Sequence, residues 1–204
     1  MKLELDHIAI AAATLAQGKA MVEAALGVSL QPGGQHAHFG THNMLLGLED
    51  GLYLEVIAID PDAPALEYPR WFDLDRFHGP PKLTNWICRT DDLADAVRTL
   101  PGAGRPVALT RGDLRWQMAV PDTGILPYDN AFPALIEWQS SPHPATRLDA
   151  TGCRLHRLVI SHPEAKALQA SLSGMLSDAR VRYDTGPSGF RAEFDTPNGR
   201  RVLE

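Results

Sequence analysis

The chain has 204 residues, of which 44% are hydrophobic, a formal net charge of −6 and a pI near 5.7. This length and composition suit one sizeable soluble domain or two small ones. Because proteins that bind nucleic acid usually carry a basic face, the acidic charge argues against a nucleic-acid partner. The N-terminus does not resemble a secretory signal, and no apolar run approaches the ~20 residues needed to cross a bilayer. We therefore expect a cytoplasmic protein with no membrane partner.

The first 60 residues predict a strand, a helix and three further strands. Residues 3–12 form an apolar segment with β-branched side chains, which favours a strand. Residues 16–27 have helical spacing and end on a glycine, which predicts a helix. Three more extended segments follow, at residues 28–34, 42–48 and 52–59. This βαβββ order defines a first unit over residues 1–60.

The same order returns twice along the chain. A proline-rich connector, residues 61–81, precedes a second βαβββ unit at residues 82–140, and a further loop precedes a third βαβββ-like unit at residues 153–204. Since each unit has one helix to cover one face of its strands, the units must pair through their sheets. We predict one α+β domain in which the first two units form a cleft. The third unit would leave one sheet face without a partner, which predicts a homodimer.

Polar residues recur at matching positions inside the apolar strands. The opening strands of the first two units carry His7 and Asn85, and the closing strands carry Glu55 and Glu137. A buried acid must be paired, hydrogen-bonded or bound to a metal, because an unpaired buried charge costs several kcal/mol. One imidazole and two carboxylates that converge from three strands suit a divalent metal ion with open positions. The predicted metal ligands are His7, Glu55 and Glu137.

Several motifs together resemble the glyoxalase-like domain family of the vicinal oxygen chelate superfamily. They are LDHIAIA, GGQHAHFGTHNMLL, YLEVIAI, RTDDL, LIEWQSSPHP and DTPNGRRV, and they extend over nearly the whole chain. The resemblance implies two βαβββ units that curl into a cleft, where a metal chelates two neighbouring oxygens of the substrate. By position it implies a ligand set of His7, Glu55, Asn85 and Glu137.

The chain departs from the superfamily pattern at Asn85, whose neutral amide is a poor ligand for a transition metal. Arg89 lies two steps further along the same strand face, where its guanidinium could pair with Glu137 and replace the ion. Two alternatives therefore stay open. The cleft holds one divalent ion of unknown identity, or it is a polar cleft without metal. No nucleotide cofactor is expected.

The glycine-bounded segment GGQHAHFGTHN, residues 33–43, is a candidate binding loop. The resemblance places it at the mouth of the cleft, where loops carry binding groups. We predict that His36, His42 and Asn43 bind the substrate, together with Asn85 and Arg89. The alternative is that the histidines and Asn43 only stabilise the turn.

Two classes of function follow. In the first, the protein is a lyase, isomerase or dioxygenase that acts on a small, oxygen-rich molecule, either a carboxylate or an enolisable compound, with Glu55 and Glu137 as catalytic residues. In the second, a protein of the same fold binds or sequesters a small ligand without metal or chemistry. The fold alone does not decide between them.

Overall fold

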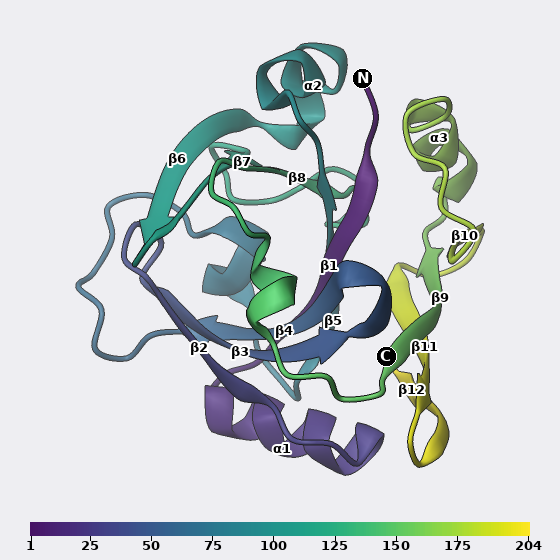
Figure 1. Cartoon of the computed structure of the whole chain (residues 1–204). Helices are drawn as coiled ribbons and strands as arrows, with labels where there is room; N and C mark the ends of the chain where they lie inside the picture. Colours follow the sequence, from purple (N-terminus) through teal and green to yellow (C-terminus); the bar gives the residue numbers. More distant parts are fainter.

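A strongly curled sheet of eight strands forms the larger part of the computed structural model, which describes residues 1–204 (Figure 1). The strand order is β2-β3-β4-β1-β5-β8-β7-β6. The first unit contains β1 (Glu4–Ala11), α1 (Leu15–Leu26), β2 (Gln31–His36), β3 (Thr41–Leu48) and β4 (Leu52–Ile59). The second contains β5 (Lys82–Arg89), α2 (Leu93–Thr99), β6 (Arg105–Arg111), β7 (Leu114–Val120) and β8 (Ala134–Trp138).

The two units join through their opening strands, because β1 and β5 pair in antiparallel orientation. Within each unit the opening strand also pairs in parallel orientation with the closing strand, β1 with β4 and β5 with β8. The helices α1 and α2 lie outside the curled sheet (Figure 1). The predicted α+β class and the pairing of two βαβββ units are confirmed.

The first turn of helix α1 lies so close to the sheet that residue 18 must be glycine. Alanine is the better helix former by about 1 kcal/mol. However, a Cβ atom at Gly18 would lie 2.3 Å from Val56 Cγ1 and 3.0 Å from Ala12 Cβ, in a buried contact. Overpacking of this kind costs roughly 1–3 kcal/mol, which outweighs the gain in propensity.

We therefore expect Gly18→Ala to lower the free energy of unfolding by up to about 2 kcal/mol in urea melts. The reverse change at the exposed position Ala20, Ala20→Gly, is the control for helix propensity without packing. If Gly18→Ala were the more stable protein, the close packing of α1 on β4 would be contradicted.

The third unit forms a separate sheet of four strands. It contains β9 (Arg154–Ser161), α3 (Ala165–Ser171), β10 (Val181–Asp184), β11 (Gly189–Thr196) and β12 (Gly199–Leu203), in the order β10-β9-β11-β12. Here the opening strand β9 pairs with β10 and β11 and not with the closing strand. The third unit therefore repeats the element order of the first two units but not their strand order.

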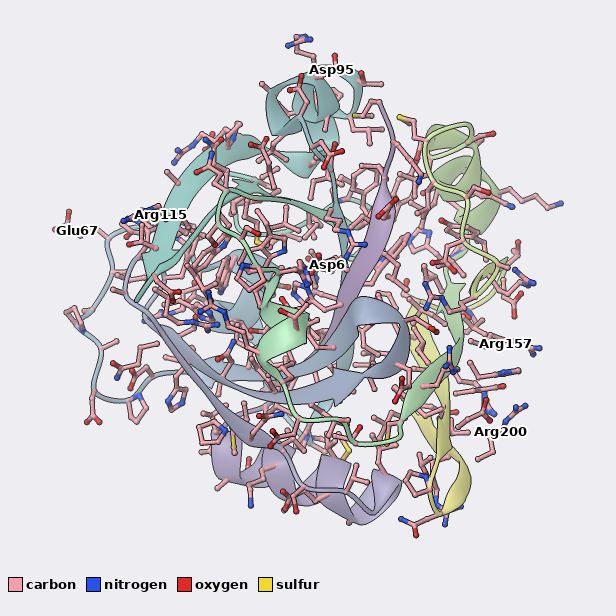
Figure 2. The ribbon with its side chains drawn as sticks, in the orientation of Figure 1. Asp6, Glu67, Asp95, Arg115, Arg157 and Arg200 are labelled. Atoms are coloured by element: carbon pink, nitrogen blue, oxygen red, sulfur yellow. The ribbon has the colours of Figure 1, made fainter.

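The apolar face of this second sheet is covered within the chain. Leu158, Ile160 and Phe194 are fully buried, β11 lies against β5, and the ring of Tyr183 lies 6.4 Å from that of Trp86. The opposite face is charged, and Arg157 and Arg200 point away from the body of the protein (Figure 2). The homodimer was predicted because the third unit would leave an apolar sheet face uncovered. That face is covered within the chain, so this argument for a dimer is wrong. The dimer itself stays a prediction.

Two short 3-10 segments lie over the concave side of the curled sheet. One is η2 (Trp71–Arg76) in the connector, and the other is η4 (Pro144–Arg147) after β8. Phe72 and Asp73 in η2 have φ angles of 59° and 57°, in the left-handed region that residues other than glycine rarely adopt. The remaining 3-10 turns are η1 (Glu49–Gly51) and η3 (Pro101–Ala103). None of the helices combines the length and the hydropathy of a membrane-spanning helix.

Candidate functional site

A small cleft of about 30 Å³ lies on the concave side of the curled sheet, with walls from both units. Its polar side chains are His7, His36, Asn43, Glu55 and Arg111. Aromatic side chains form much of the remaining wall, from Tyr53, Trp71, Phe72, Trp116 and Trp138. The site thus combines a few convergent polar groups with apolar surroundings, which is typical of small-molecule sites.

A β-bulge in the first strand brings Asp6 next to its own neighbour, His7. The pairing of β1 with β5 shifts between Leu5 and His7, so Asp6 is an extra residue on β1. Its Oδ1 atom lies 2.6 Å from His7 Nδ1. Because a carboxylate only accepts hydrogen bonds, Nδ1 carries the proton and Nε2 of His7 is the free nitrogen. His7 also stacks on Tyr53, with ring centroids 4.3 Å apart.

Asp6 is a fully buried carboxylate that accepts hydrogen bonds from three side chains (Figure 2 labels Asp6). Besides His7, it accepts hydrogen bonds from His143 Nε2 at 2.8 Å and Trp138 Nε1 at 3.1 Å. Burial by itself raises the pKa of Asp6, but the hydrogen bonds from His143 and His7 outweigh it and hold the pKa below its usual range. Asp6 is therefore ionised and fixes the orientation of His7.

Glu55 lies close to His7 on the neighbouring strand β4. One of its oxygens, Oε1, accepts a hydrogen bond from Asn43 Nδ2 at 2.5 Å, and the other, Oε2, lies 3.7 Å from His7 Nε2. The side-chain oxygen of Asn43 in turn accepts from the backbone N–H of Gly34 at 2.8 Å. Since both polar ends of Asn43 are engaged, the Glu55 carboxylate is held in place with one oxygen toward His7.

Arg111, at the end of β6, closes the cleft from the second unit. Its Nη1 atom lies 3.1 Å from His36 Nε2 and 3.2 Å from Asn43 Oδ1, so it connects the edge strands of both units. Its Nε and Nη2 atoms donate to no protein acceptor, and no carboxylate lies within 4.0 Å of the guanidinium. Arg111 is thus a positive charge whose protein partners are all neutral.

His36 is neutral in this arrangement. Burial, and next the charge of Arg111, lower the pKa of His36 to about 3. Its Nε2 atom accepts from Arg111, and Nδ1 lies 3.0 Å from Thr41 Oγ1. Burial and the nearby Asp6 and Glu55 carboxylates raise the pKa of Tyr53, so its phenol also stays neutral.

The sequence profile of the glyoxalase-like domain matches residues 5–176. The chain belongs to the glyoxalase-like domain family. The resemblance inferred from the sequence motifs is confirmed. No curated protein sequence matches the chain significantly.

Several solved structures are similar to the chain at low sequence identity, and the first of them has the same fold. A hypothetical protein from Staphylococcus aureus has a TM-score of 0.67 and 15% identity, over 93% of this chain and 88% of that one. Methylmalonyl-CoA epimerase from Mycobacterium tuberculosis has a TM-score of 0.44 and 22% identity, over 70% of this chain and 91% of that one. A methylmalonyl-CoA epimerase bound to methylmalonyl-CoA and NH4+ has a TM-score of 0.46 and 19% identity, over 71% and 100% of the two chains.

In this glyoxalase-like domain, Glu137 does not join His7 and Glu55. Met118 and Ile136 lie opposite each other in the wall of the cleft, as do Trp116 and Trp138, so Glu137 belongs to the other face of β8. There its carboxylate accepts a hydrogen bond from Leu93 N, at 2.7 Å, at the beginning of α2. An acid at this end of a helix is stabilised by the helix dipole. The prediction that Glu137 lies in the cleft is therefore wrong, and its carboxylate instead contacts the beginning of α2.

Three other predicted binding residues also lie outside the cleft. Asn85 is fully buried and neither of its amide atoms has a hydrogen-bond partner, but it does not line the cleft. Arg89 pairs with Glu4 at 2.9 Å and approaches Asp6 to 3.8 Å, and it does not contact Glu137. His42 belongs to the opposite face of β3 from Asn43, with Nδ1 3.9 Å from Asp60. Of the predicted binding residues, the structure brings His36 and Asn43 into the cleft.

The side chains of the cleft do not fit the predicted divalent ion. A catalytic metal site usually takes three protein ligands, and here only His7 and Glu55 converge. No group of three His, Cys, Asp or Glu side chains in the chain has the arrangement of a metal site. His36 Nε2 already accepts from Arg111, whose charge would repel a cation at this position. The side chains of the cleft therefore do not complete the predicted metal site.

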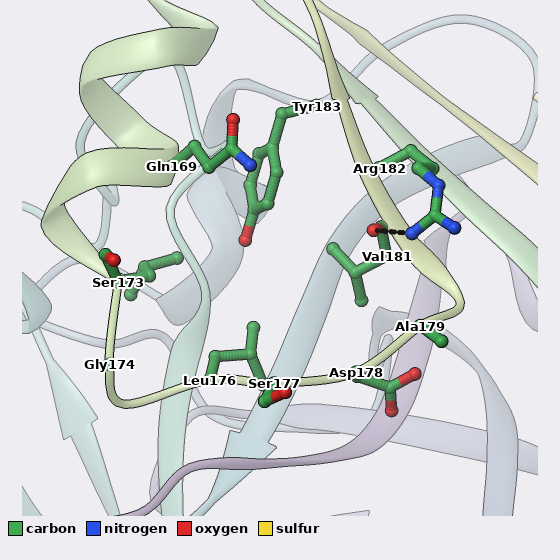
Figure 3. A pocket seen from close by; sticks show the side chains of 11 residues that line it. Gln169, Ser173, Gly174, Leu176, Ser177, Asp178, Ala179, Val181, Arg182 and Tyr183 are labelled. Atoms are coloured by element: carbon green, nitrogen blue, oxygen red, sulfur yellow. Dashed lines mark hydrogen bonds between the residues drawn. The ribbon is translucent and has the colours of Figure 1, made fainter.

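A larger cavity lies in the third unit but lacks comparable chemistry. It has about 340 Å³ and lies between the end of α3 and β10 (Figure 3). Gln169, Ser173 and Tyr183 surround it, and its one acid, Asp178, is already paired with Arg180 at 2.7 Å. The convergent ionisable groups are in the cleft, so the cleft is the candidate site.

Sequence reasoning missed Asp6, Arg111 and His143. An Asp-His dipeptide was visible in the first strand, but ordinary alternation places neighbours on opposite faces. Nothing in the sequence around Arg111 or His143 indicated that distant segments bring them to His36 and Asp6.

Proposed function

We propose that the protein binds a small oxygen-rich anion, a carboxylate or an enolate, with Arg111 as its anchor. The observation that supports this most directly is the absence of any carboxylate within 4.0 Å of Arg111, although the chain carries 25 acidic residues. A charge in a half-enclosed aromatic cleft is costly without a counter-charge. Guanidinium groups also match the two oxygens of a carboxylate in geometry.

We further propose that the cleft moves a proton on the bound molecule. His7 has its Nε2 atom free and its Nδ1 proton held by Asp6, which is the arrangement of an oriented general base. Glu55 Oε2 lies 3.7 Å from that nitrogen and can accept or return the proton. If the proton leaves a carbon next to a carbonyl group, the electron pair moves to the carbonyl oxygen. Arg111 would then stabilise the enolate oxygen by its positive charge.

The experiment uses the smallest candidate anions, since a cavity of about 30 Å³ admits few heavy atoms. Formate, acetate and pyruvate are titrated by calorimetry into protein purified without a histidine tag and treated with a chelator. Exchange of the pyruvate methyl protons in deuterium oxide is then followed by proton NMR. We expect binding, and exchange faster than in buffer.

His7→Gln and Glu55→Gln should lower the exchange rate at least about a hundredfold, the scale of general acid-base catalysis. Binding without exchange would favour the alternative of a protein that binds or sequesters its ligand. If none of the three anions binds, the proposed function is overturned.

A further inference from the structure

Trp71 carries a buried hydrogen-bond donor without an acceptor. The residue is 3% exposed, and its Nε1–H has no partner in the protein. Two of the other three tryptophans have an acceptor in the protein, since Trp86 Nε1 donates to Ala131 O at 2.8 Å and Trp138 Nε1 donates to Asp6. Because buried indole N–H groups usually find a partner, the acceptor for Trp71 should come from outside the protein.

Two cavities border Trp71, and only one can hold an acceptor. The first has about 10 Å³, and 7 of its 9 lining residues are hydrophobic. A water molecule needs roughly 10–15 Å³ and at least two polar partners, which this cavity does not offer. The second is the cleft, which has about 30 Å³ and contains Arg111, His7 and Glu55. The missing acceptor therefore belongs in the cleft.

The indole ring is held firmly at this place. It stacks on Phe39 at 4.4 Å and on Phe72 at 5.1 Å, and the edge of His36 meets it at 5.1 Å. His36 is also the side chain whose Nε2 accepts from Arg111. The Trp71 N–H and the Arg111 guanidinium thus border one cavity from two different segments, η2 and β6.

We infer that Trp71 is a ligand-binding residue whose Nε1–H donates to one oxygen of the bound anion while Arg111 holds the other. The inference rests on the proposed function, because it needs an anion at Arg111. It also adds to the specificity of the site, since two donors fixed on separate walls select a molecule with two neighbouring oxygens. Anions with one acceptor oxygen would leave one of the two donors unsatisfied.

The test compares two Trp→Phe variants that each remove one indole N–H. Trp71→Phe should weaken the binding of acetate and pyruvate at least about tenfold, because a hydrogen bond to a charged acceptor is lost. Its urea midpoint should fall less than that of Trp86→Phe, since both variants lose the same buried ring volume but only Trp86 also loses a hydrogen bond to the protein. Trp86→Phe is the matched control, which should lower the urea midpoint and leave the affinity unchanged.

A second measurement detects the contact in the wild-type protein, and the variant serves only for the assignment. The indole N–H signal of Trp71 is assigned in a nitrogen-15 spectrum as the signal that is absent from Trp71→Phe. Addition of acetate should change the chemical shift of this signal more than that of the Trp86 indole N–H signal. If the chemical shift of this signal does not change, or if Trp71→Phe binds the anions with unchanged affinity, the inference is overturned. The proposed function survives that result if Arg111→Met abolishes binding, and both fall if the wild-type protein binds none of the anions.

Discussion

Arg111→Met should abolish the binding of small carboxylates while the protein stays folded. Arg111 is the one positive charge among the cleft side chains, and its Nε and Nη2 donors are unused. Loss of a charged, hydrogen-bonded partner in a desolvated site costs roughly 2–5 kcal/mol of binding free energy. We therefore expect the affinity for acetate or pyruvate to fall at least about thirtyfold in calorimetric titrations.

Arg89→Met is the matched control for this change. Arg89 is the arginine that the sequence predicted for the anion, but it pairs with Glu4 and is a third exposed. Because a partly exposed ion pair contributes at most about 1 kcal/mol, and Asp6 keeps its three hydrogen bonds, this variant should lose little stability and keep its affinity. The opposite pattern, with binding lost in Arg89→Met and kept in Arg111→Met, would show that the anion binds at Arg89 and not at Arg111.

The second large effect concerns the dependence of stability on pH. Burial and the Arg111 charge lower the pKa of His36 in the folded protein to about 3, whereas an unfolded histidine has a pKa near 6.5. Below about pH 6.5 the unfolded chain therefore binds a proton that the folded protein does not, and the folded state loses stability as the pH falls. The loss approaches about 1.4 kcal/mol per pH unit for this one group.

Urea melts at pH 6.5, 5.5 and 4.5 measure this loss. Between pH 6.5 and 4.5 the wild-type protein should lose about 2 kcal/mol more than His36→Gln, which has no group to protonate at this position. The pKa of Asp6 is also depressed, but its contribution is lost only below about pH 4, as the pH falls toward the folded-state pKa. Equal slopes for the two proteins above pH 4.5 would contradict a buried, neutral His36.

The positions of His7 and Glu55 could be predicted because they follow the simplest rule for strands. Each is a polar residue inside an apolar segment, and the parallel pairing of β1 with β4 places both on the concave face. Alternation alone then brings them into one cleft. The number of units and the class of fold followed from the same kind of pattern.

Glu137 shows where that rule is insufficient. Strand β8 has 5 residues, and a shift of one position moves every side chain to the opposite face. The pattern of residues in this short strand is compatible with either Glu137 or Trp138 facing the cleft. The register with β7 decides it, since Trp138 lies opposite Trp116 in the cleft wall and Glu137 lies opposite Gln117.

Asp6 and Arg111 depend on features that no local pattern contains. Asp6 reaches the ring of its neighbour His7 because of a bulge in β1, and a bulge depends on the pairing with β5. Arg111 enters the cleft because the edge strand β6 approaches β2, which brings it to His36 across 75 residues of chain. Both are consequences of the curled sheet as a whole.

We propose that this cleft binds an anion through Arg111 and needs no metal ion to do so. The most direct measurement is the calorimetric titration of chelator-treated, tag-free protein with pyruvate, repeated after addition of Zn²⁺ or Mn²⁺. We predict the same affinity in all three titrations, because the donor set offers a guanidinium and only two convergent metal ligands. Binding that occurs only after metal is added would contradict the account.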